Sequence, residues 1–97
     1  MYDQRGHGLS EKPETGYTWQ VHAADLVALI AALGLERPRV IGHSGGAAAA
    51  MLAAASHPDL MACLILEDPC WGTQGGGWES TKVGMRQWFL GLGSKTC

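Results

Sequence analysis

The fold is decided by residues 39–57, which read RVIGHSGGAAAAMLAAASH. Arg39 to His43 predict a short strand, because valine and isoleucine follow Pro38 and a glycine-rich turn ends the run. The residues after the turn, about Gly45 to His57, are nearly all small, which predicts a helix that can approach a sheet closely and that Pro58 ends. The sequence therefore predicts a strand that passes through a tight turn directly into a helix.

A second helix is expected before this unit and a second strand after it. Apolar side chains recur at the helical spacing i, i+3, i+4, i+7, at Leu26, Leu29, Ile30 and Leu33. Thr18 is placed to cap the start of this helix, and Gly34 is placed to end it. Downstream, residues 60–66 form the continuous apolar run LMACLIL, which is typical of a parallel strand buried on both faces.

These elements predict an α/β fold. If residues 1–3 are the tail of a strand, the order is β-α-β-α-β, and the handedness of such crossovers places the helices over a parallel sheet. Both edges of that sheet would be open, and an open edge is prone to aggregation. We therefore expect neighbouring strands outside this sequence, so that the chain begins and ends within a domain.

The chain divides into two parts of different character. Residues 1–71 carry the predicted sheet and helices, whereas residues 72–97 are predicted to be a loop followed by the start of a lid or cap, or a truncated tail. The glycines between Trp71 and Trp78 indicate the loop. A short amphipathic pattern follows, at Met85, Trp88, Phe89 and Leu92.

Composition excludes several classes of function. The 97 residues carry a formal net charge of -2 without a block of Lys or Arg, so nucleic-acid binding is not expected. No apolar run reaches the roughly 18 residues of a membrane-spanning helix, and residues 1–6 lack the apolar core of a signal peptide, so a cytoplasmic location is expected. The three cysteines, Cys63, Cys70 and Cys97, lack metal-type or redox-type spacing and are expected to be free thiols.

Residues 42–46 read Gly-His-Ser-Gly-Gly, a Gly-x-Ser-x-Gly pattern that suits a serine nucleophile. A serine hydroxyl reacts poorly at neutral pH unless a base activates it and hydrogen-bond donors stabilise the oxyanion that forms. Between a strand and a helix this pattern exposes the serine oxygen on a sharp turn, and glycines on both flanks make room. Ser44 is the expected nucleophile, with the N–H of Gly45 as the first oxyanion donor. The alternative is a turn whose serine merely caps the helix.

Three ordered motifs resemble the α/β-hydrolase superfamily. Residues 3–10, DQRGHGLS, are similar to its D-x-R-G-x-G-x-S segment. Residues 41–46, IGHSGG, are similar to its nucleophile turn, which is often G-H-S-x-G-G and is here one residue shorter before the alanines. Residues 57–60 and 66–69 resemble the helix end and the following strand. The resemblance covers about residues 1–71 and implies a hydrolase with a serine nucleophile.

The resemblance also implies what a complete site needs. The family's triad runs Ser, then Asp or Glu, then His along the chain, and a second oxyanion donor comes from a loop before these residues. The only histidine after Ser44 is His57, at the far end of the following helix and roughly 20 Å away, so it cannot be the base. We expect a fragment of a serine hydrolase that acts on an ester or related acyl bond and is inactive alone. The alternative is a catalytically incomplete fragment or a non-enzymatic interaction module with the same fold.

Other residues near the predicted site have different roles. Asp68, at the predicted end of a strand, either orients a histidine as the triad acid or bonds turn amides. His43 and Trp71 are expected to contact substrate. His7 is expected to shape its loop through hydrogen bonds, and His22 is expected to lie on the surface.

The aromatic residues suggest an apolar lining, so a small, apolar, ester-like substrate is expected. No cofactor and no metal are expected, because the sequence lacks dinucleotide and phosphate-loop patterns and metal-type spacing. A serine at this turn also argues against relatives that open epoxides or displace halide, which use an aspartate there. The identity of the substrate, the oligomeric state and independent folding of the chain are left open.

Overall fold

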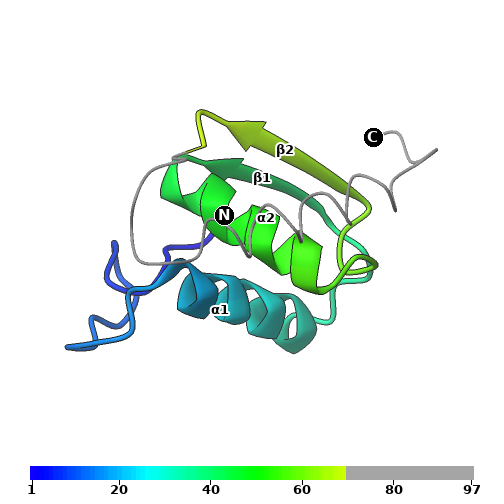
Figure 1. The fold of residues 1–97 in the computed structure, drawn as a ribbon. Coiled ribbons are helices and arrows are strands. Elements are labelled where there is room, and N and C mark those ends of the chain that lie inside the picture. The colour runs from blue at the N-terminus through cyan, green and yellow to red at the C-terminus, as the bar shows by residue number, and fades with distance from the viewer. Residues whose placement is uncertain (70–97) are drawn as a thin grey trace.

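Two helices and two strands alternate along the part of the chain that the structure describes. The computed structural model describes residues 1–69, and its elements are α1 (Trp19–Ala32), β1 (Arg39–His43), α2 (Gly45–Ser56) and β2 (Cys63–Glu67). A loop of residues 1–18 precedes α1 and lies beside the start of that helix (Figure 1). The strand, turn and helix predicted within residues 39–57 are confirmed.

The strands β1 and β2 form a parallel sheet. They pair in register from Arg39 opposite Cys63 to His43 opposite Glu67. The helix α2 connects them and lies between the sheet and α1 (Figure 1), so this segment is one βαβ unit with a further helix packed on α2. The predicted α/β fold, with helices packed over a parallel sheet, is confirmed.

The strand tail predicted at residues 1–3 is absent, because these residues belong to no ladder. A strand exists only through pairing with a neighbour, and within residues 1–69 β1 pairs with β2 alone. The observed order is therefore α-β-α-β. The domain boundary predicted at residue 71 and the lid predicted after it lie outside the described residues.

The small side chains of α2 allow it to be buried on nearly all sides. Ala47 and Ala49 have no exposed surface. The core cluster joins α1, α2 and the segment before β2, and it contains Ala23, Leu26, Ile30, Ala50, Ala53, Ala54 and Met61. Because alanine keeps the helix thin, α1 and the sheet both approach it closely and share one small core.

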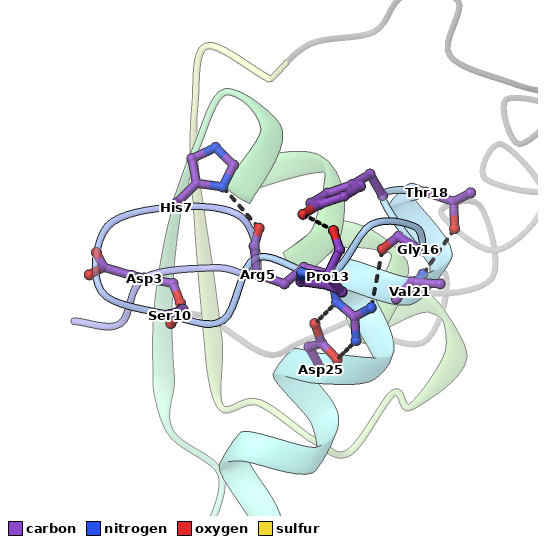
Figure 2. Close-up of polar contacts among 10 residues, drawn as sticks. Asp3, Arg5, His7, Ser10, Pro13, Gly16, Thr18, Val21 and Asp25 are labelled. Carbon is purple, nitrogen blue, oxygen red and sulfur yellow. Dashed lines mark hydrogen bonds and ion pairs between the residues drawn. The ribbon is translucent and has the colours of Figure 1, made fainter.

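Both ends of α1 are closed as the sequence predicts. The Oγ1 atom of Thr18 accepts a hydrogen bond from the amide of Val21 at 3.3 Å (Figure 2). At the other end Gly34 adopts a φ of +63°. Its amide donates to the carbonyl oxygen of Ala31, and the amide of Leu35 donates to that of Ile30. These bonds satisfy carbonyl groups that the helix leaves free, and they need a left-handed conformation that glycine adopts without strain.

No helix within residues 1–69 covers one face of the sheet. Ile41 and Ile65 lie opposite each other in the register and are 70% and 50% exposed. Both described helices lie on the other side of the sheet (Figure 1). The prediction that residues 60–66 are buried on both faces is therefore wrong for β2 in this part of the chain.

Cys63 is disulfide-bonded in the structure, so the expectation of a free thiol is wrong at this residue. Cys70 and Cys97 lie outside the described residues. Neither helix within residues 1–69 has the length and apolar character that crossing a bilayer requires.

Candidate active site

Ser44 lies at the junction of β1 and α2 in a strained backbone conformation. Its φ of 51° and ψ of -116° are rare for any residue except glycine, and such a conformation costs on the order of 1–3 kcal/mol. Its amide donates to the carbonyl oxygen of Glu67 at 3.0 Å, and its own carbonyl accepts from the amides of Ala47 and Ala48. The end of β2 and the first turn of α2 thus hold this residue in place.

The hydroxyl of Ser44 does not cap α2. No hydrogen bond joins its side chain to the first amides of the helix, although serine is a good capping residue. The alternative of a turn whose serine merely caps the helix therefore lacks its defining bond. The strained backbone is typical of a nucleophile turn, and the hydroxyl is not occupied in capping the helix.

The two flanking glycines differ in how strictly the turn needs them. A Cβ on Gly42 would lie 2.7 Å from the Cα of Ala47 and 2.7 Å from the carbonyl oxygen of Gly46, and backbone atoms of a helix cannot move aside cheaply. A Cβ on Gly46 would meet only the side-chain nitrogen of Gln4, at 3.9 Å. The prediction that both glycines make room is confirmed for Gly42 and wrong for Gly46, which faces the cavity described next.

A cavity of about 710 Å³ opens beside the turn, a volume that suits a small molecule. Its polar and aromatic lining comes from the turn, from the N-terminal loop and from the start of α1, and includes His7, Trp19, His22, His43, Ser44 and Gly45. His43 is exposed, and its substrate contact stays a prediction. Trp71, the other predicted contact, lies outside the described residues.

An ion pair ties the N-terminal loop to α1. The guanidinium group of Arg5 donates hydrogen bonds of 2.6 and 2.7 Å to the carboxylate of Asp25 and one of 3.3 Å to the carbonyl oxygen of Gly16 (Figure 2). These bonds lower the pKa of Asp25, because they favour its charged form. Both side chains are partly exposed, so water screens the attraction, and the pair orients the loop more than it stabilises the fold.

Short-range hydrogen bonds shape the same loop. Asp3 accepts one from the amide of Leu9 on its carboxylate and one from the hydroxyl of Ser10 on its carbonyl oxygen. Figure 2 shows the Nδ1 of His7 directed at the carbonyl oxygen of Arg5, 3.1 Å away, and because a carbonyl oxygen only accepts, Nδ1 is the donor. The prediction that His7 and its neighbours shape the loop is confirmed, and the loop brings His7 to the cavity.

His22 is buried, so its predicted surface position is wrong. Only 4% of the residue is exposed, and its ring centroid lies 6.3 Å from that of Tyr17 and 5.9 Å from that of Trp19. Its Nδ1 has no hydrogen-bond partner within residues 1–69. The sequence contains the missed signal, because His22 precedes Leu26 by one helical turn and so extends the buried stripe of α1.

Comparison with known proteins identifies the family. A family model described as alpha/beta hydrolase fold matches residues 1–96. The chain belongs to this family. In this family the strand-to-helix turn after a parallel strand is where the nucleophile is found, and the strained Ser44 lies at that position here.

Related α/β-hydrolases are longer than this chain. A 2-(acetamidomethylene)succinate hydrolase from Mesorhizobium japonicum is 47% identical over 66 residues, which make up 68% of this chain and 24% of that protein. The solved structure of Est816, an N-acyl homoserine lactone degrading enzyme, has a TM-score of 0.68 and 32% identity, covering 93% of this chain and 36% of Est816. The solved structure of the epoxide hydrolase CorEH has a TM-score of 0.67 and 29% identity, and the match covers 95% of this chain and 34% of CorEH. The chain therefore spans about a quarter to about a third of the length of these proteins.

Two residues after Ser44, His57 and Asp68, are weighed as its catalytic partners. His57 follows the last residue of α2, and the 12 residues of that helix separate it from Ser44 by about 20 Å, so it is out of reach as a base. Asp68 follows β2 with a φ of 45°, next to the Glu67 carbonyl that binds the Ser44 amide. Asp68 is exposed and is not among the described residues that line the cavity, and its role as triad acid stays a prediction. Within residues 1–69 no group of three or more His, Cys, Asp or Glu is placed to hold a metal ion.

Replacing Gly42 with alanine is expected to lower the free energy of unfolding by roughly 3 kcal/mol or more, because the added methyl group meets backbone atoms of α2 at 2.7 Å. Gly46→Ala is the matched control. It has space for the methyl group and replaces glycine with a better helix former, so its stability should stay within about 1 kcal/mol of the wild type. Urea unfolding measures the stability of both variants. Equal decreases in the free energy of unfolding would contradict the proposed role of the Gly42 contact.

The stability of this α/β-hydrolase core is expected to fall in acid because His22 is buried. Burial is the main cause that lowers the pKa of His22 below its usual value of 6.5; the charge of Asp25 opposes this shift, and those of Arg5 and His7 reinforce it. The unfolded chain therefore binds the proton at a higher pH than the folded chain does. The free energy of unfolding should be greatest above pH 6.5 and decrease as the pH falls through the pKa of folded His22.

Urea unfolding at pH values on both sides of 6.5 measures this dependence. His22→Phe keeps an aromatic ring beside Tyr17 and Trp19 and removes the titrating group, so its profile should be flatter than that of the wild type. His57→Ala removes an exposed histidine and should keep the wild-type profile. If the free energy of unfolding of His22→Phe depends on pH as steeply as that of the wild type, another group causes the loss of stability in acid.

Proposed function

We propose that this chain is the nucleophile-bearing part of a serine hydrolase that cleaves an ester or a related acyl bond. The observation that carries the proposal is Ser44, which lies at the cavity in a strained turn and does not use its hydroxyl as a helix cap. Two related proteins support an acyl-type bond, since one is a 2-(acetamidomethylene)succinate hydrolase and the other degrades N-acyl homoserine lactones.

In the proposed reaction the Oγ atom of Ser44 attacks the acyl carbon while a base takes the hydroxyl proton. The N–H of Gly45 donates to the oxyanion, and the amides of the first turn of α2 add a favourable partial charge. Collapse of the tetrahedral intermediate expels the protonated leaving group and leaves an acyl-enzyme. Water then attacks the acyl carbon, which releases the acid and restores the hydroxyl.

We propose that the general base and the second oxyanion donor belong to the rest of a protein as long as the relatives. His57 is too far from Ser44 to serve as the base. His22 is buried, and its lowered pKa makes it a weaker base. Asp68 is retained as the candidate acid, because it directly follows the strand that binds the amide of Ser44.

The substrate is proposed to be a small, largely apolar, ester-like molecule. Much of the cavity lining away from Ser44 is apolar or aromatic, contributed by Tyr2, Leu26, Val40, Ile41 and Ala50. Such a lining binds an acyl or alkyl group through burial of apolar surface, while the few polar groups near the turn orient the reacting carbonyl.

A catalytically incomplete or non-enzymatic role is the second candidate. One observation favours it: within residues 1–69 the histidine that follows Ser44, His57, lies at the far end of α2 and out of reach of the Ser44 hydroxyl. In that case the chain keeps the fold as an interaction module and carries out no reaction. The reactivity of Ser44 distinguishes the two candidates.

The 97-residue chain by itself is expected to show no Ser44-dependent labelling by a fluorophosphonate probe, because within residues 1–69 no hydrogen bond joins a base to the hydroxyl. The Ser44→Ala variant defines the background, and in-gel fluorescence measures the labelling. Strong labelling that disappears in Ser44→Ala would contradict the absence of a base. His7→Ala would then test whether Nε2 of His7 serves that purpose.

In a longer protein of this family that contains the sequence, Ser44→Ala is expected to lower kcat for a p-nitrophenyl ester by about 10⁴-fold or more, because only the nucleophile forms the acyl-enzyme. Ser56→Ala, at the exposed far end of the same helix, is the control and should keep wild-type activity. Release of p-nitrophenol measures both variants. Full esterase activity in Ser44→Ala would overturn the assignment of the nucleophile.

A further inference from the structure

Trp19 occupies the space of a side chain at position 45. A Cβ on Gly45 would lie 2.9 Å from Cη2 and 3.0 Å from Cζ3 of the indole ring. In the turn that this family often has, G-H-S-x-G-G, the residue after the serine is the variable one. Here that residue is glycine, and a ring from α1 fills the space beside it.

The position of Trp19 in α1 restricts its ring. Trp19 is the first residue of the helix, directly after the capping Thr18. Its ring centroid lies 5.9 Å from that of His22, which is one turn further along the helix and only 4% exposed. A buried neighbour on the same helix limits where the indole can move. The indole is therefore restricted on the side that faces His22.

Trp19 also lines the cavity that contains Ser44 and Gly45. It is half-buried, so part of the ring contacts the turn while another part borders the space for a ligand. A flat and rigid apolar ring at this place limits the width of the cavity next to the nucleophile. Because glycine is the most flexible residue, the ring also restrains the Gly45 peptide, whose N–H donates to the oxyanion in the proposed reaction.

We propose that Trp19 is a specificity-determining residue of the Ser44 site, where it replaces the side chain that position 45 lacks and sets the width available to the acyl group. The specificity role rests on the proposed function of Ser44, whereas the contact between Trp19 and Gly45 does not. Straight acyl chains fit beside the ring. Acyl groups that branch next to the carbonyl carbon are excluded by it.

A double-mutant cycle in the 97-residue chain tests the contact. Gly45→Ala should lower the Tm by about 5 °C when Trp19 is present, because the methyl group meets the ring. In the Trp19→Ala background the same substitution should leave the Tm unchanged or raise it, since alanine is the better helix former. Gly46→Ala is the matched control, and its effect should be the same in both backgrounds.

Two further measurements keep this test decisive if Trp19→Ala does not fold. Trp19→Phe has a smaller ring and should reduce the loss caused by Gly45→Ala. In ¹H–¹⁵N spectra the Gly45 amide should shift in Trp19→Phe more than the Gly46 amide, because the indole ring current acts mainly on the nearer peptide. Equal Tm losses in all backgrounds, or an unshifted Gly45 amide, would overturn the contact.

The specificity role is tested in the longer hydrolase with p-nitrophenyl esters of a straight and of an α-branched acid. Trp19→Ala should raise kcat/KM for the branched ester relative to the straight one by about tenfold, because a pocket wall has been removed. Adding Gly45→Leu in that background returns a side chain to the same space and should reverse the change. Gln20→Ala, at the exposed next position of α1, should leave the ratio unchanged.

The outcomes separate the two proposals. Ser44-dependent hydrolysis with an unchanged ester ratio in Trp19→Ala would overturn the specificity role and leave the proposed function standing. Absence of any Ser44-dependent hydrolysis would overturn the proposed function and the specificity role with it. In that case the cycle in the 97-residue chain would still decide whether Trp19 stands in for a side chain at position 45.

Discussion

The close approach of two backbone segments, at Gly42 of β1 and the first turn of α2, is the contact on which the site depends. A Cβ on Gly42 would lie 2.7 Å from Cα of Ala47, so only glycine allows the strand to come this near to the helix that follows it. Ser44 alone separates the strand from the helix, and it adopts a φ of 51°. The carbonyl of Glu67 and the first amides of α2 hold this strained residue through hydrogen bonds.

The alanines of α2 allow the same close packing of backbone segments in the core. Since α2 has few large side chains, α1 packs against one side of it and the sheet against the other, and the large apolar groups come from α1 and from the segment before β2. This arrangement brings the start of α1, with Trp19 and His22, to the cavity beside Ser44. The Arg5–Asp25 pair adds the N-terminal loop to the same region and places His7 there. Three segments that are distant in the sequence therefore meet at one serine.

Features that depend on neighbouring residues alone were predictable. The strand at residues 39–43, the helix after it, the cap at Thr18 and the left-handed Gly34 all follow from local patterns, and the structure confirms them. The burial of His22 was missed because a histidine in a helix is usually read as polar, although its spacing from Leu26 placed it on the buried stripe. The strand tail at residues 1–3 was predicted wrongly because a strand needs a pairing partner, which the local sequence does not reveal.

The sequence by itself determined the α/β class, the family and the serine at the turn, because the strand pattern, the glycine spacing and the run of alanines are all short-range signals. Only the tertiary structure decided that the Ser44 hydroxyl leaves α2 uncapped, that Gly46 has room for a methyl group and that Gly45 has none. Each of these depends on atoms brought from elsewhere by packing: the carbonyl of Glu67, the open cavity and the ring of Trp19. Spacing along a chain encodes which backbone conformations are favourable, whereas the space around a side chain is set by the elements that pack beside it.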